Sequence, residues 1–279
     1  GQHWMTPHDV EMSLKKLDHL IIRIGEPDEW DQETFLAGQL RADSYLRNLD
    51  VIRRFRVQRQ WRRWGKTDRN VIQDFGAPLS VVNAMYSPIT NTISVYAGLL
   101  QHPFVHERYD NATMYATIGM ILAHEMAHAF GPYGRRFNYE GSFKAGRMGW
   151  WDRSTVTKYD EQLLCIMNAY GTSENTHSCP SFPNSTEVGN LYGQMTLTET
   201  VADVMGLRAA YEAYWNASAP VSTGAATAPV SLAAAPVGAG AEAKKMWMYS
   251  FAQMWCSVSS PEYTCKQMTG DVHPNASVR

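Results

Sequence analysis

The stretch Ile121-Leu-Ala-His-Glu-Met-Ala-His128 carries two histidines four residues apart, with a glutamate directly after the first. Its apolar surroundings predict one long helix from about residue 113 to residue 130, which Gly131-Pro132 would end. On a helix, side chains at i and i+4 share one face, so both imidazoles could reach one Zn²⁺ ion. Burying such polar groups without partners is costly, and a metal ion supplies a partner. The alternative is a buried helix whose polar side chains are satisfied without a metal.

Glu125 follows His124 on the same predicted helix, where it cannot easily bind a metal together with the two histidines. It can instead hold a water molecule at the metal. The metal would lower the pKa of that water, and the carboxylate would take its proton. A nucleophile generated in this way beside a Lewis acid suits the hydrolysis of an amide bond.

A third protein ligand is expected in the segment TLTETVADVMG (196–206). Glu199 and Asp203 are again four residues apart on a predicted helix. Glu199 could therefore bind the metal while Asp203 accepts the free ring N–H of a ligand histidine. Exposed helices often carry such a pair without any function, so the signal is weak alone. It becomes strong when it follows the histidine motif.

This order of motifs resembles the gluzincin peptidases, and the flanking segments resemble one branch of them, the neprilysin and endothelin-converting-enzyme family. The matching segments follow the family's order along nearly the whole chain. They are 82–86 (VNAMY), 96–104 (YAGLLQHPF), 134–137 (GRRF), 150–151 (WW), 251–256 (FAQMWC) and 271–274 (DVHP) with Arg279. The chain departs from the family after His128, where Gly131-Pro132 replaces two acidic residues.

The resemblance implies a role for each matching polar residue. His124, His128 and Glu199 match the ligands of one Zn²⁺ ion. Glu125 matches the general base, and Asp203 matches the carboxylate that supports a ligand histidine.

The resemblance also implies a binding site for the substrate. Asn83 and Ala84 match an edge strand that pairs with the substrate backbone, and Arg279 matches an arginine that binds a substrate carbonyl. His273 matches the residue that stabilises the oxyanion. The hydrophobic pocket for the residue after the scissile bond would comprise Leu99, Phe104, Ile121 and Trp255. Without the resemblance, Asn83 would be interpreted as a strand-end residue, His273 as a loop histidine, and Leu99 and Phe104 as core.

The fold implied is a predominantly helical α+β fold, a thermolysin-like zinc peptidase core with a small β-sheet. We expect one domain over 1–279, the catalytic lobe of a longer protein, without the family's N-terminal capping region and C-terminal tail. The small-residue, Pro- and Gly-rich composition of residues 216–243 predicts a flexible low-complexity loop within this domain. The function implied is a zinc metalloendopeptidase that cuts oligopeptides on the amino side of hydrophobic residues. The alternatives are a non-catalytic neprilysin-like binding or decoy ectodomain, or an inactive fragment.

The composition limits which binding partners and which cellular compartment the protein can be expected to have. A net charge of -2 argues against nucleic acid and against an anionic membrane as partners. Four Asn-x-Ser/Thr sequons and four cysteines favour an extracellular or luminal protein, either secreted or the ectodomain of a single-pass membrane protein. The expected partners are oligopeptides and the missing N-terminal lobe. The resemblance leaves Cys165 and Cys256 without their family partners, so they would stay free or re-pair with Cys179 and Cys265.

Hydrophobic periodicity gives an approximate secondary structure. We expect the first 75 residues to be helical, with the arginine-rich segment 53–63 solvated and Trp61 and Trp64 anchoring its other side. Two strands are predicted at 80–86 and 92–97. Further helices are predicted at 156–170, from 198 past 214, and at 243–258, followed by an irregular tail. We expect the sequon at Asn275 to be unglycosylated because a glycan there would crowd the site.

Overall fold

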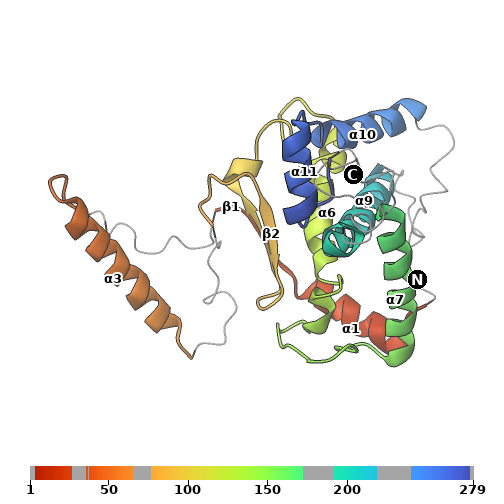
Figure 1. Cartoon of the computed structure of the whole chain (residues 1–279), viewed down its shortest axis with the longest axis horizontal. Helices are drawn as coiled ribbons and strands as arrows, with labels where there is room; N and C mark the ends of the chain where they lie inside the picture. Colours follow the sequence, from red (N-terminus) through yellow and green to blue (C-terminus); the bar gives the residue numbers. More distant parts are fainter. Residues whose placement is uncertain are drawn as a thin grey trace.

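A computed structural model of the chain describes residues 4–26, 36, 38–65, 77–171, 192–218 and 240–276. It shows a helical body with a small sheet along one side and one helix, α3, standing apart from the body (Figure 1). The predominantly helical α+β fold predicted from the sequence is confirmed. Every helix within the described ranges is too short or too polar to cross a membrane.

Two helices, α6 (Ile118–His128) and α9 (Leu197–Ser218), pack along each other at the centre of the body (Figure 1). Their close approach depends on Gly206. A Cβ atom at this position would lie 2.6 Å from the backbone nitrogen of His124, a distance that real Cβ atoms do not tolerate. The glycine at the end of the Glu-x-x-x-Asp segment therefore lets α9 contact the backbone of the helix that carries both histidines.

The single helix predicted over 113–130 is wrong, because the chain forms α5 (Asn111–Ala116) and then α6. The break lies at Thr117, whose ψ of -94° is not helical. The Thr117 hydroxyl lies 2.8 Å from the carbonyl oxygens of both Thr113 and Phe104. The contact with Phe104, 13 residues away, competes with helix continuation, and no local periodicity reveals it.

Within the described residues the sheet has three strands, in the order β1-β3-β2. The predicted strand pair is present with narrower bounds, as β2 (Ala84–Ser87) and β3 (Thr92–Tyr96), which run antiparallel. The expectation of an entirely helical N-terminal part is wrong, because β1 (Ile21–Gly25) pairs in parallel with β3. Parallel pairing depends on a partner 71 positions away, as in Ile21 opposite Thr92, so local propensity does not predict it.

Apart from α3, the remaining described helices lie around this centre. They are α1 (Pro7–Asp18), α7 (Arg153–Tyr170), α10 (Ala241–Met254), α11 (Pro261–Gly270) and two short 3₁₀ turns, η1 (Ala97–Leu99) and η2 (Gly134–Arg136). Helix α11 replaces the irregular tail that we predicted. Ser260 caps it by accepting the backbone N–H of Tyr263, and Pro261 occupies its first turn. Of the predicted loop 216–243, residues 219–239 lie outside the described ranges, while α9 and α10 extend into its two ends.

Helix α3 (Tyr45–Arg63) does not use its tryptophans as anchors, contrary to our expectation. Trp61 is 67% exposed and Trp64 is 80% exposed, and their rings contact each other with centroids 5.7 Å apart. The two indoles therefore bury part of their surface against one another rather than against the body of the protein.

The main hydrophobic core lies between the sheet and the central helices. Trp247 of α10 is fully buried in it, with its ring edge-on to Tyr211 of α9 at 5.3 Å and stacked on Phe251 at 6.1 Å. Aromatic pairs of this kind add to the free energy gained by burying their area. Trp247 thus holds α10 against the helix that supplies Glu199.

We expect Trp247→Ala to lower the free energy of unfolding by about 3–5 kcal/mol, because it removes a fully buried indole and leaves a cavity. Urea unfolding followed by circular dichroism measures the change. Tyr249→Ala on the same helix is the matched control, since Tyr249 is 66% exposed and its loss should cost about 0.5 kcal/mol or less. Equal effects of the two substitutions would contradict this assignment of the core.

Candidate metal centre

Helix α6 brings the two histidine rings together. The Nε2 atoms of His124 and His128 lie 3.0 Å apart, and the rings are nearly perpendicular, at 89°. Both nitrogens can therefore face a single ion. Spacing of i and i+4 on one helix produces this arrangement, as the sequence predicted.

Glu199 on α9 supplies the third group. Its Oε2 lies 3.2 Å from His124 Nε2 and 3.4 Å from His128 Nε2. One ligand atom from each of the three residues lies within 4.8 Å of the others, so the group could hold a metal ion. Zinc–ligand bonds of about 2.0–2.1 Å in a tetrahedron separate neighbouring ligands by about 3.3 Å, which matches these spacings. Glu199 Oε2 is buried and faces these ring nitrogens at 3.2 Å or more, and a cation would satisfy it more fully.

Asp203 fixes the ring of His124. Its Oδ1 lies 2.8 Å from His124 Nδ1, so the ring donates that N–H and would offer the lone pair of Nε2 to a metal ion once Nε2 loses its proton. Burial opposes a charged imidazole, but the hydrogen bonds to Asp203 and Glu199 outweigh it and raise the pKa of His124 to about 9. For Glu199, burial is likewise outweighed by hydrogen bonds from the two histidines, which hold its pKa far below the ordinary value.

Glu125 is buried beside the two histidines but is not one of the three grouped ligands. Burial raises the pKa of its carboxyl, and the charges of His124 and His128 oppose that shift. The backbone N–H of Tyr86, in β2, also hydrogen-bonds the Glu125 carboxylate. The carboxylate is therefore held between α6 and the edge strand, where it can exchange a proton with a group at the site.

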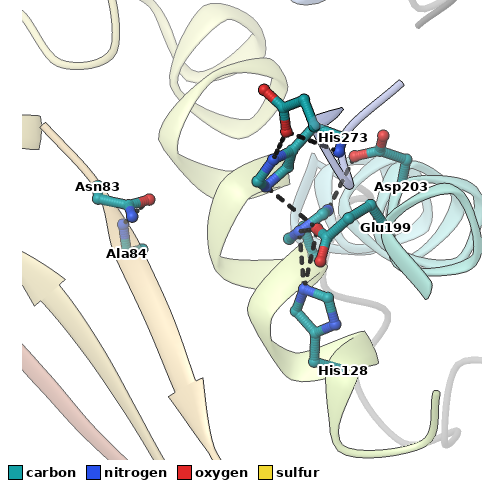
Figure 2. A network of polar contacts seen from close by, with 8 residues as sticks. Asn83, Ala84, His128, Glu199, Asp203 and His273 are labelled. Carbon is teal, nitrogen blue, oxygen red and sulfur yellow. Dashed lines mark hydrogen bonds and ion pairs between the residues drawn. The ribbon is translucent and has the colours of Figure 1, made fainter. Parts of the chain in front are cut away.

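His273 reaches the same group from the segment after α11 (Figure 2). Its Nε2 lies 3.4 Å from Glu199 Oε2, and its side chain is 51% exposed. Asp271 orients it, because Asp271 Oδ1 accepts the backbone N–H of His273 at 2.9 Å and lies 2.8 Å from the ring Nδ1. Asp271 has no predicted role of its own from the sequence. The Asp-x-His spacing was the available signal, since an aspartate two residues before a histidine can bond its ring and backbone together.

Asn83 directly precedes β2 and Ala84 begins it, and both lie apart from the polar group (Figure 2). Strand β2 is at an edge of the sheet and packs against α6. Asn83 is exposed and its Oδ1 accepts the backbone N–H of Ala84 at 2.9 Å. Ala84 thus begins an edge strand next to the helix of the histidines, and Asn83 directly precedes that strand.

The four residues predicted to form a hydrophobic pocket belong to one cluster. Leu99 and Ile121 are buried in the main core, and Phe104 and Trp255 are partly buried against it. Their placement fits the core interpretation as well as the pocket interpretation. Arg279 lies outside the described residues.

Two of the four cysteines, Cys165 and Cys256, are free and exposed. Cys265 is disulfide-bonded, and Cys179 lies outside the described residues. Of the two alternatives expected for Cys165 and Cys256, the structure shows the free cysteines and not the re-paired ones.

A model of peptidase family M13 matches residues 83–279. Human neprilysin is 28% identical over 284 residues, which cover 99% of this chain and 34% of that protein. Bovine endothelin-converting enzyme 1 is 34% identical over 193 residues, which cover 69% of this chain and 22% of that protein. The family resemblance inferred from the motifs is confirmed, and the chain spans 34% of the length of human neprilysin.

Solved structures show the same fold. The crystal structure of the zinc metalloprotease Zmp1 of Mycobacterium tuberculosis in complex with an inhibitor superposes with a TM-score of 0.72 at 22% identity. The match covers 99% of this chain and 38% of that chain. PepO from Lactobacillus rhamnosis gives a TM-score of 0.70 at 22% identity, again over 99% of this chain and 38% of that chain.

We expect His128→Ala to lose most of the zinc that the purified chain retains, because it removes one of three ligands. Atomic emission spectroscopy measures the metal content per chain. His106→Ala is the control, since His106 is exposed and its Nδ1 bonds only the backbone N–H of Arg108. Unchanged zinc content in His128→Ala would contradict the proposed ligand set.

Asp203→Asn should weaken zinc binding by about 10–100-fold without unfolding the chain. The amide keeps the shape of the side chain but loses the charge that holds His124 Nδ1–H. Competition with a chelating dye gives the affinity. A variant that binds zinc as tightly as the unmodified chain would show that His124 needs no support from Asp203.

Proposed function

We propose, because this chain belongs to peptidase family M13, that it is the catalytic part of a zinc-dependent endopeptidase that cuts oligopeptides. The observation that carries the proposal is the grouping of His124, His128 and Glu199, with a buried Glu125 beside them that is not one of the three. A buried glutamate next to a metal-ligand set suits the metal-assisted hydrolysis of an amide bond.

A bound Zn²⁺ would supply a Lewis acid for the substrate carbonyl and would lower the pKa of a nearby water. The residues of the chain do the rest. Glu125 takes the proton of the attacking water and passes it to the leaving amine. The backbone N–H of Tyr86, in β2, is a hydrogen-bond partner for this carboxylate.

His273 is the donor for the oxyanion that develops on the substrate carbonyl. Its ring stands at the open side of the site, half-exposed, and Asp271 holds Nδ1 so that Nε2 faces inward. A donor fixed in advance needs no reorganisation when the charge develops.

The substrate backbone would pair with the edge strand at Asn83 and Ala84. A hydrophobic side chain following the scissile bond would be accepted by Leu99, Phe104, Ile121 and Trp255, and Arg279 would bind a substrate carbonyl. The family resemblance supports these roles, and the position of β2 beside α6 supports the first of them. We further propose that the protein acts outside the cell or in a luminal compartment, on the basis of its four sequons.

Glu125→Gln should lower kcat/KM for a short fluorogenic peptide by about 10²–10⁴-fold, because the amide cannot accept the proton of the attacking water. The variant should retain its zinc. Glu161→Gln is the matched control, since Glu161 is exposed on α7. A chelator should stop cleavage by the unmodified chain.

Folded, zinc-loaded chain that cuts no peptide would contradict the proposal. That result would favour the alternative function, a non-catalytic neprilysin-like binding domain. Cleavage that persists in Glu125→Gln would contradict the assigned general base instead.

A further inference from the structure

Lys16 on α1 is a buried cation that the proposed reaction does not use. It is 4% exposed, and its Nζ donates hydrogen bonds to three backbone carbonyl oxygens, of Ala129 at 2.8 Å, Gly134 at 2.7 Å and Phe137 at 2.8 Å. Burial lowers the pKa of its ammonium to about 7. Three acceptors require three N–H donors, which only the charged form has, so the hydrogen bonds oppose that shift.

The three carbonyls belong to the turn that follows the histidine helix. Ala129 comes directly after His128, and the other two flank η2. This turn folds back tightly against the end of α6. Gly134 permits the close approach, since a Cβ atom at this position would overlap the carbonyl oxygen of His128. The ammonium therefore ties Ala129, the residue that directly follows the end of α6, to the returning chain at a single point.

A second set of contacts joins Lys16 to the edge strand. Its backbone carbonyl accepts the side-chain N–H of Asn91 at 2.9 Å, and Asn91 accepts the hydroxyl of Tyr86 at 2.9 Å. Lys16 Nζ also lies 5.9 Å from the centre of the Tyr86 ring. Since the Tyr86 N–H bonds Glu125, one residue of α1 is linked to both sides of the site.

His128 needs such support more than His124 does. His124 Nδ1 is held by Asp203, whereas His128 Nδ1 has no hydrogen-bond partner among the described residues. The direction of the His128 ring is then set by the backbone at the end of α6, which is where the ammonium of Lys16 binds.

We propose that Lys16 is a positioning residue for the metal centre, which fixes the turn after His128 and thereby the place of that ligand relative to Glu199 and β2. Its connection with peptide hydrolysis rests on the function proposed above. Its effect on metal binding does not, so the two can be tested apart.

The test compares Lys16→Met with Lys15→Met in the full chain. Methionine keeps the length of the side chain and removes all three donors. Lys15 is exposed on the same helix, with its Nζ 4.0 Å from the centre of the Tyr139 ring, so its loss changes charge without touching the turn. The readouts are zinc affinity, by competition with a chelating dye, and the visible absorption spectrum of the Co²⁺-substituted protein.

We expect Lys16→Met to weaken zinc binding about tenfold or more and to change the cobalt spectrum, as outer supports of metal ligands do. Lys15→Met should leave both unchanged. A folded Lys16→Met with the zinc affinity and the cobalt spectrum of the unmodified chain would overturn the proposal, even if its thermal stability is reduced. If Lys16→Met does not fold, Lys16→Gln, which keeps two donors, is measured by the same criteria.

The outcomes separate this proposal from the proposed function. An unmodified chain that binds zinc but cuts no peptide would contradict the peptidase and leave the role of Lys16 to be decided by the affinities. Normal cleavage by the unmodified chain, with unchanged metal binding in the folded variant, would overturn only the role of Lys16. An unmodified chain that binds neither zinc nor cobalt would overturn both.

Discussion

The contact between α6 and α9 is the constraint on which the site depends. Two ligands come from one helix and the third from another, 71 residues later in the chain, so no local structure can bring the three together. The helices approach closely enough because Gly206 has no side chain where α9 meets the backbone of His124. One turn earlier on α9, Asp203 reaches the ring of the same histidine, so a single interface supplies both the third ligand, Glu199, and the support for His124.

The electrostatics of this interface favour a cation. Glu125, Glu199 and Asp203 are largely withdrawn from water, and a buried carboxylate is costly unless it is paired. The histidines balance part of this charge, but their two Nε2 atoms face each other at 3.0 Å, where at least one must carry a proton. A divalent ion would replace that proton and satisfy all three ligand atoms at once. The residues are thus arranged for a metal at some cost to the stability of the metal-free chain.

The sequence predicted the parts of this protein that depend on local spacing. Residues i and i+4 on a helix identified the histidine pair and the Glu199–Asp203 pair, and β-branched residues identified β2 and β3. The failures have a common physical cause. The break at Thr117 and the pairing of β1 with β3 both depend on partners far away in the chain. Helix α11 is different, because its Ser-Pro start was a readable signal that the irregular-tail prediction overlooked.

Lys16 could not be predicted at all, since its acceptors are backbone carbonyls. No residue type marks a carbonyl as an acceptor, so a lysine in an amphipathic helix is naturally interpreted as solvated. Trp61 and Trp64 show the opposite error, because large aromatic residues on a helix are naturally interpreted as buried. In both cases burial was decided by packing that the helical pattern does not contain.

His273 lies in a segment without regular secondary structure after α11, and a hydrogen bond to a buried tyrosine holds that segment in place. The hydroxyl of Tyr192, which is almost fully buried, accepts the backbone N–H of Asn275 at 2.6 Å, two residues after His273. The carbonyl of Tyr192 in turn accepts the backbone N–H of Thr196 at 3.0 Å, just before α9 begins. His273 and Glu199 are therefore both anchored to residues 192–196. One short segment thus contacts the chain just after His273 and leads directly into the helix that carries Glu199.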